Sequence, residues 1–167
     1  RWALLERCLD SEAINSADIL CLNEADYGMA RSGNRHVPFE IAQRLGMTAV
    51  FGPCFYEYTK GIGDERLSPG ENSTSLQGNA LLTRLRVVEN RNVVLPQCHD
   101  PASSEEKRSG GRAALIARLR TSRNTMFTLA VAHLEVLTTR RCRSRQLRAV
   151  LDEMGREGPA IIAGDFN

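Results

Sequence analysis

The 167-residue sequence lacks most of the patterns by which large enzyme classes are recognised. It has no apolar run of about 18 residues, the length that a membrane-spanning helix needs. It has no Gly-x-Gly-x-x-Gly or Walker pattern, which argues against a nucleotide cofactor. It also has no Gly-x-Ser-x-Gly elbow, which argues against a serine hydrolase of the α/β type. Any chemistry must therefore come from other side chains.

A strong charge bias is also missing. The formal net charge is +2 at pH 7, and a dedicated nucleic-acid-binding domain usually concentrates many more basic residues on one face. The net charge therefore neither excludes nucleic acid as a partner nor supports it. With 42% hydrophobic and 25% charged residues, the chain has the composition of an ordinary globular domain. One domain covering 1–167 is therefore expected.

The cysteines lack a pairing pattern. They are odd in number and scattered, without a Cys-x-x-Cys pair: Cys8, Cys21, Cys54, Cys98 and Cys142. We therefore expect reduced thiols in a cytoplasmic protein rather than a disulfide framework. The chain begins Arg1-Trp2-Ala3 with neither Met nor a signal-like apolar segment, so we expect the true start of the gene product to lie upstream.

The last ten residues are the most informative stretch. Residues 160–163 form a short apolar run between Gly158-Pro159 and Gly164, which indicates a buried strand. The strand would deliver Asp165 and Asn167 to one side, because residues two apart in an extended segment point the same way. A carboxylate and an amide suit phosphoryl chemistry, where one orients water and the other stabilises charge. A simple turn after a strand would use the same residue types.

The rest of the chain alternates between predicted helices and strands. Apolar residues at helical spacing predict helices, and short apolar or β-branched runs predict strands. Helices are expected over 2–16, 37–45 and 138–155, and strands over 17–22, 48–59, 78–84, 87–95, 112–120 and 126–134. The short connection between 78–84 and 87–95 predicts an antiparallel pair. We expect 60–77 to form a long loop and 97–111 to be disordered.

Three predicted strands end in polar groups of a similar kind. Glu24 follows the first strand, His133 lies at the end of another, and Asp165 and Asn167 follow the last. Hard oxygen ligands without a Cys or His cluster favour Mg²⁺, which uses one or two carboxylates and completes its shell with water and substrate phosphate. Metal-assisted hydrolysis of a phosphate ester is the chemistry that follows.

Five segments, taken in order, resemble the endonuclease/exonuclease/phosphatase superfamily. They are 17–24 (ADILCLNE), 78–84 (GNALLTR), 131–134 (VAHL), Arg145-Gln146 and 164–167 (GDFN). The resemblance implies a four-layer α/β sandwich of two mixed sheets flanked by helices. His133 followed by Leu134 is similar to the sphingomyelinase-like and deoxyribonuclease I-like branches.

The resemblance also implies roles. Glu24 would be a Mg²⁺ ligand, with Mn²⁺ as a substitute, and Asp165 would orient or deprotonate the water that attacks phosphorus. Asn167 would contact the scissile phosphate, and His133 would bind or polarise a phosphate oxygen.

Three more residues are expected to bind substrate. One is Asn79, in the 78–84 segment. Arg140 and Arg143 face nearer the apolar stripe of the last helix than its other arginines, so they are the better candidates for an anionic ligand.

Two parts of the family pattern are not found. The first strand of the family, with an Asn, would precede Arg1, and the second half, with a closing Asp-His pair, would follow Asn167. We therefore expect a single domain, incomplete at both ends and inactive as residues 1–167 alone.

The function is expected to be that of a Mg²⁺-dependent phosphodiesterase or phosphatase. A DNA endonuclease or exonuclease of the same superfamily is one alternative, and a non-catalytic remnant or interaction domain is the other. A remnant would have little reason to keep Glu24, His133, Asp165 and Asn167 together. The pattern does not distinguish nucleic acid, phospholipid and small phosphoesters as substrates.

Overall fold

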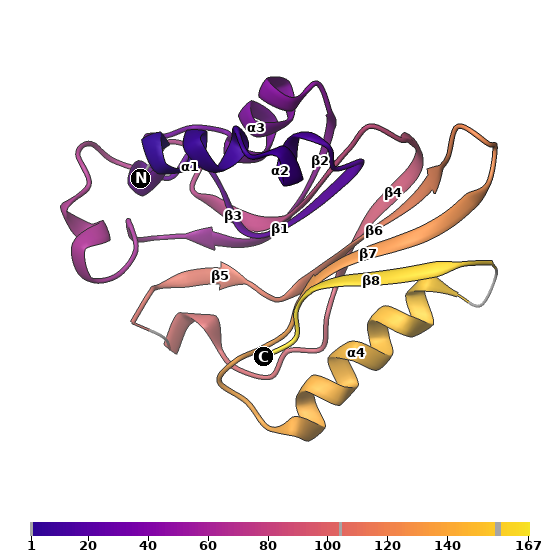
Figure 1. The fold of residues 1–167 in the computed structure, drawn as a ribbon. Helices are drawn as coiled ribbons and strands as arrows, with labels where there is room; N and C mark the ends of the chain where they lie inside the picture. Colours follow the sequence, from indigo (N-terminus) through magenta and orange to yellow (C-terminus); the bar gives the residue numbers. More distant parts are fainter. Residues whose placement is uncertain (1, 104, 156–157) are drawn as a thin grey trace.

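Two four-stranded sheets form the centre of the molecule, and helices cover their outer faces (Figure 1). The structure is a computed structural model that describes residues 2–103, 105–155 and 158–167. Within these residues, no helix is both long and apolar enough to cross a membrane.

The first sheet has the strand order β1-β3-β2-β5, and all its neighbours are antiparallel. The second sheet has the order β4-β6-β7-β8; its first two pairings are antiparallel and the pairing of β7 with β8 is parallel. The strands are β1 (Ile19–Tyr27), β2 (Thr48–Glu57), β3 (Leu76–Thr83), β4 (Arg86–Val94), β5 (Arg108–Gly110), β6 (Ala113–Arg120), β7 (Met126–His133) and β8 (Ala160–Asp165).

The helices complete a four-layer α/β sandwich, as predicted. In Figure 1, α1, α2 and α3 lie over the first sheet, and α4 lies against the second. They are α1 (Trp2–Leu9), α2 (Glu12–Asn15), α3 (Val37–Leu45) and α4 (Arg140–Met154), with 3₁₀ turns η1 (Ala30–Ser32), η2 (Gly63–Leu67) and η3 (Pro101–Ser103). Helix α4 begins after Thr139, whose hydroxyl accepts the Cys142 N–H, as the side chain of an N-cap residue does.

Each boundary between layers is an apolar core. One core joins α3 to the first sheet, a second fills the space between the sheets, and a third joins α4 to the second sheet. Alternation along the strands decides which side chain enters which core. Leu129 and Val131 of β7 face the space between the sheets, whereas Ala130 and Ala132 face α4. The same alternation directs His133 between the sheets.

The structure corrects four expectations. Strands β3 and β4 do not pair, because the chain crosses from one sheet to the other at Arg84-Leu85. The predicted single helix over 2–16 is two helices, separated at Asp10 and Ser11. The segment 97–111, expected to be disordered, contains η3 and β5, and β5 pairs with β2; Ser104 of this segment lies outside the described residues.

The fourth correction concerns the cysteines. Cys98 and Cys142 form a disulfide, with their Cα atoms 6.0 Å apart, whereas reduced thiols were expected. The bond joins the segment after β4 to the first turn of α4. Gln146, one turn further along α4, donates to the Pro96 carbonyl oxygen at 3.0 Å. Helix packing thus brings two cysteines together that are 44 positions apart in the sequence.

Candidate functional site

A β-bulge within β1 presents Glu24. Leu22 pairs with Ala80 and Ala25 pairs with Gly78, so Asn23 and Glu24 together oppose the one residue Asn79. Glu24 has a φ of 54°, in the left-handed region that side chains disfavour. An inserted residue bends a strand and re-aims its side chains. Here it turns the Glu24 side chain outward, where it is 62% exposed.

The parallel pairing of β7 and β8 places two other predicted residues side by side. His133 and Asp165 are direct partners in this ladder. The residue before Asp165 must be glycine: a Cβ on Gly164 would come within 1.9 Å of the Ala132 carbonyl oxygen, and its φ is +132°. The glycine of the Gly-Asp-Phe-Asn segment therefore allows the close backbone approach that aligns Asp165 with His133.

His133 lies between the two carboxylates. Its Nδ1 is 3.9 Å from Glu24 Oε1, and its Nε2 is 3.8 Å from Asp165 Oδ2. Burial, and then the nearby Arg112 guanidinium, lower the pKa of His133, while the charges of the two carboxylates and of Glu135 act in the opposite direction. The ring is therefore mostly neutral at pH 7, with one nitrogen able to donate and the other to accept.

Asn167 completes the predicted group. Its backbone N–H donates to Asp165 Oδ1 at 3.0 Å, and its side-chain Nδ2 donates to the Leu134 carbonyl oxygen at 3.0 Å. These bonds fold the end of the chain back over the end of β7. One Asp165 oxygen thus accepts from the backbone while the other faces His133. The structure brings Glu24, His133, Asp165 and Asn167 together at one end of the two sheets.

The remaining predicted residues do not present polar groups to the site. Asn79 is 1% exposed, so it is placed inside the protein rather than at a surface that a substrate would touch. Arg143 Nη1 donates to the carbonyl oxygens of Glu135, Val136 and Thr138, each at 3.2 Å. It holds the segment between β7 and α4. Arg140 is exposed at the start of α4.

Two supporting residues, Asn23 and Arg112, were missed in the sequence. Asn23 Nδ2 donates to Asn79 Oδ1 at 2.7 Å and to the Ala132 carbonyl oxygen at 3.2 Å. Arg112 is 7% exposed, with its Nε 3.7 Å from Glu135 Oε2. The position of Asn23 beside Glu24 was the one visible signal; Arg112 looked like any arginine at the start of a predicted strand.

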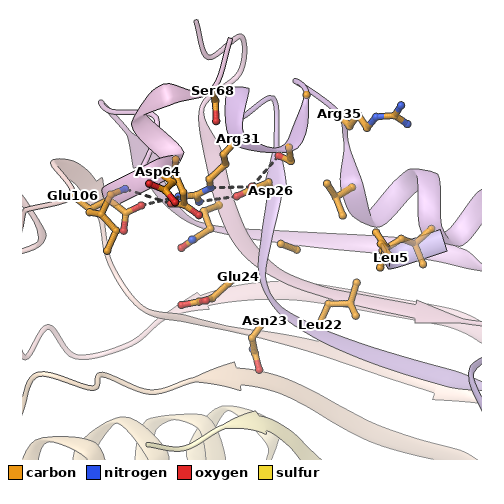
Figure 2. Close-up of a pocket in the computed structure, with 18 of the residues that line it drawn as sticks. Leu5, Leu22, Asn23, Glu24, Asp26, Arg31, Arg35, Asp64, Ser68 and Glu106 are labelled. Carbon is orange, nitrogen blue, oxygen red and sulfur yellow. Dashed lines mark hydrogen bonds and ion pairs between the residues drawn. The ribbon is translucent and has the colours of Figure 1, made fainter. Parts of the chain in front are cut away.

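A cavity of about 1290 Å³ opens beside Glu24. Figure 2 shows Glu24 and Asn23 at its lower side and Arg31, whose side chain is 8% exposed, above them. Arg31 donates to both Asp26 oxygens, at 2.8 and 3.0 Å, and to Glu106 at 2.8 Å. Although burial alone would lower the pKa of Arg31, these hydrogen bonds and charges raise it. Arg31 therefore stays positively charged and holds Asp26 and Glu106 together in the cavity wall.

The donor set fits a hard cation only in a limited way. Among the described residues, no group of three or more His, Cys, Asp or Glu side chains is arranged to hold a metal. Glu24 presents an exposed carboxylate, and the His133 ring separates it from Asp165. Mg²⁺ commonly takes one or two protein carboxylates and fills its shell with water and phosphate oxygens. Glu24 fits that type of ligand.

Comparison with solved structures identifies the fold. The chain superposes on an endonuclease/exonuclease/phosphatase protein from Beutenbergia cavernae with a TM-score of 0.66 and 20% identity, covering 92% of this chain and 39% of that chain. It covers 44% of ANGEL2, a 2′,3′-cyclic phosphatase, with a TM-score of 0.64 and 16% identity. It covers 56% of a mannosyl-6-phosphatase from Bacteroides thetaiotaomicron, with a TM-score of 0.59 and 13% identity.

These matches confirm, at the level of the fold, the resemblance predicted from the sequence. The described chain has the fold of the endonuclease/exonuclease/phosphatase proteins and spans 39% to 56% of the lengths of these three structures. No protein-family model and no curated protein matches it.

Proposed function

We propose that this chain carries part of the active site of a Mg²⁺-dependent phosphoester hydrolase. The observation that carries the proposal is the placement of His133 between Glu24 and Asp165, at 3.9 and 3.8 Å. The fold supports it, because the similar structures include a 2′,3′-cyclic phosphatase and a mannosyl-6-phosphatase. A fold alone does not establish an activity, so the site residues must carry the argument.

Each residue has a role that its surroundings permit. Asp165 would orient the attacking water with Oδ2, since Oδ1 is held by the Asn167 N–H. His133, neutral because its pKa is lowered, would donate one N–H to a phosphoryl oxygen. The Asn167 amide has a second N–H besides the one given to Leu134, and this second donor would reach the phosphate.

Glu24 is the residue proposed to hold the metal. Its carboxylate is exposed and borders the cavity. When bound, Mg²⁺ supplies charge stabilisation to the phosphoryl oxygens and activates water. The resemblance implies further groups beyond these, so inactivity of isolated residues 1–167 is part of the same proposal.

The charges that line the cavity indicate which class of substrate it would accept. Its lining holds five carboxylates and two guanidinium groups: Glu24, Asp26, Asp64, Glu65 and Glu106, with Arg31 and Arg35. Such a field repels a polyanion. We therefore expect a small phosphoester to be preferred over nucleic acid.

A hydrolysis panel tests this proposal. A small phosphoester, a phospholipid and single-stranded DNA are each incubated with the full-length protein, with Mg²⁺ or with EDTA. Turnover of at least one substrate with Mg²⁺, abolished by EDTA, is expected. No turnover of any of the three substrates by the full-length protein would remove the hydrolase assignment.

A further inference from the structure

The bulge at Glu24 needs something to hold it. The backbone of Glu24 has a φ of 54°, a conformation that a residue with a Cβ adopts only when its surroundings impose it. The bulge also breaks the ladder between β1 and β3 at this point. The local backbone therefore does not by itself keep Glu24 in place.

Two asparagine side chains span this gap and reach the second sheet. The Asn23 amide donates to Asn79 Oδ1 at 2.7 Å and to the Ala132 carbonyl oxygen at 3.2 Å. The Asn79 amide in turn donates to the Ala113 carbonyl oxygen at 2.7 Å. The Asn23 amide thus connects the residue next to Glu24 with Ala132, the residue next to His133. Through Asn79, it is also connected to Ala113 at the start of β6.

We propose that Asn23 and Asn79 are positioning residues, whose joined amides hold the β1 bulge against the second sheet and so set Glu24 relative to His133. The proposal rests on the proposed function for the roles of those two residues. Neither side-chain amide has an N–H placed to bind substrate: Asn79 is 1% exposed, and the Asn23 amide donates to the carbonyl oxygens of Asn79 and Ala132. Their effect is on where the Glu24 carboxylate is presented.

The direction of each hydrogen bond makes the arrangement specific. Asn23 must donate twice, and Asn79 must accept from Asn23 while donating to Ala113. An aspartate at 23 would place a carboxylate against two acceptors, whereas a serine would keep one donor. Serine at position 23 should therefore be less harmful than alanine, and aspartate at least as harmful as alanine. Side-chain size alone would make aspartate, which has nearly the size of asparagine, the least harmful of the three.

The experiment measures Mg²⁺ affinity by titration calorimetry and unfolding by heat, so that it does not depend on turnover. Asn23→Ala and Asn79→Ala should each weaken Mg²⁺ binding by about 10–100-fold, the usual effect of losing a group that orients a metal ligand. The double variant should bind Mg²⁺ only slightly more weakly than the single variant with the lower Mg²⁺ affinity, because both substitutions remove the same hydrogen-bonded connection. Asn23→Ser should recover part of the loss, and Asn23→Asp should be at least as harmful as Asn23→Ala.

Asn92 provides a matched control. Its amide also spans the two sheets, donating from β4 to the Pro53 carbonyl oxygen in β2 at 2.7 Å. Asn92→Ala should lower the melting temperature in the way the site variants do, yet leave Mg²⁺ affinity unchanged. If Asn79→Ala does not fold, the series of three substitutions at Asn23 decides the matter alone.

The outcomes separate this inference from the proposed function. Normal Mg²⁺ affinity in folded Asn23→Ala and Asn79→Ala overturns the positioning role, even if the wild type hydrolyses phosphoesters. Weakened Mg²⁺ binding in these variants supports the role, even if no substrate in the panel is hydrolysed. A wild-type protein that binds no Mg²⁺ overturns both.

Discussion

Asp165 Oδ2 lies 3.8 Å from His133 Nε2, and the two residues are direct partners in the parallel ladder of β8 and β7. Because the backbone sets this pairing, the contact does not depend on a long flexible side chain. The Asp165 charge raises the pKa of His133, against burial and Arg112, which lower it. The electrostatic effect of Asp165 on His133 can therefore be measured as a change in the pKa of His133.

We predict that Asp165→Asn lowers the pKa of His133 further. The amide keeps the shape of the carboxylate but removes the negative charge that favours the protonated ring. Turnover should also fall by about 10²–10⁴-fold, since a group that handles the proton of water is lost. NMR titration of the His133 ring and kcat on the best substrate measure the two effects. Asp152→Asn, on α4, is the control; an unchanged His133 pKa in the site variant would contradict the assigned contact.

We predict that Glu24→Gln weakens the dependence on Mg²⁺. The side chain keeps its length and its place beside the cavity, but an uncharged oxygen is a poorer ligand for a hard cation. The Mg²⁺ concentration that gives half-maximal activity should rise, and kcat should fall. Glu89→Gln, which changes an exposed carboxylate on β4, should leave the titration as it is. An unchanged titration in Glu24→Gln would remove Glu24 from the metal site.

Much of the fold could be predicted because the spacing of apolar residues along the sequence distinguishes helices from strands. The helices α3 and α4 begin and end close to their predicted limits, since His36 and Thr139 cap them and Gly46 and Gly155 end them. The pairing of β3 with β4 was wrong for a physical reason. A two-residue connection suits a hairpin, but it also suits a step between two packed sheets, and only the packing distinguishes them.

The site shows the same division. His133 and Asp165 could be predicted because polar residues at strand ends stand out against apolar runs. Glu24 was predicted to follow a strand that ends at residue 22, whereas it lies in a bulge within β1. Asn23 could not, because the bulge that gives it a role is a property of the pairing with β3 and not of β1 alone. Arg112 could not either, since its effect on the His133 pKa depends on burial that only tertiary packing creates.

We predict that Gly164→Ala destabilises the protein and disturbs the site. The new Cβ would meet the Ala132 carbonyl oxygen at 1.9 Å, and the φ of +132° is unfavourable for alanine. Strained backbone of this kind costs about 1–3 kcal/mol, and the steric contact adds to it. The two strands must separate to relieve the contact, which moves Asp165 away from His133.

Gly70→Ala separates the two causes. Gly70 also has a positive φ, +74°, but a Cβ at this position would have no atom within 4 Å. Urea unfolding of both variants should show a clearly larger loss for Gly164→Ala. Equal losses would mean that the close approach of β7 and β8 contributes nothing beyond backbone conformation.

The last prediction concerns Glu57, a buried carboxylate on β2 that the proposed chemistry does not use. Its side chain is fully buried and its Oε1 lies 3.5 Å from Arg108 Nη1. Burial, reinforced by the charge of Glu106, raises its pKa to about 7, despite the opposing charges of Arg108 and Arg31. Glu57 is therefore protonated in the folded state at pH values where the unfolded chain has already released the proton.

The sign of the effect on stability follows. The folded state binds more protons at Glu57 than the unfolded state between its ordinary pKa of 4.5 and about 7. Stability from this group is therefore present at low pH and lost as pH rises through that window. Glu57→Gln keeps the shape without the charge, so its melting temperature should match the wild type near pH 4 and exceed it at pH 8. The difference between the two melting curves, followed from pH 4 to pH 8, isolates Glu57 from the histidines. A constant difference across that range would show that Glu57 ionises in the folded protein as it does in the unfolded chain.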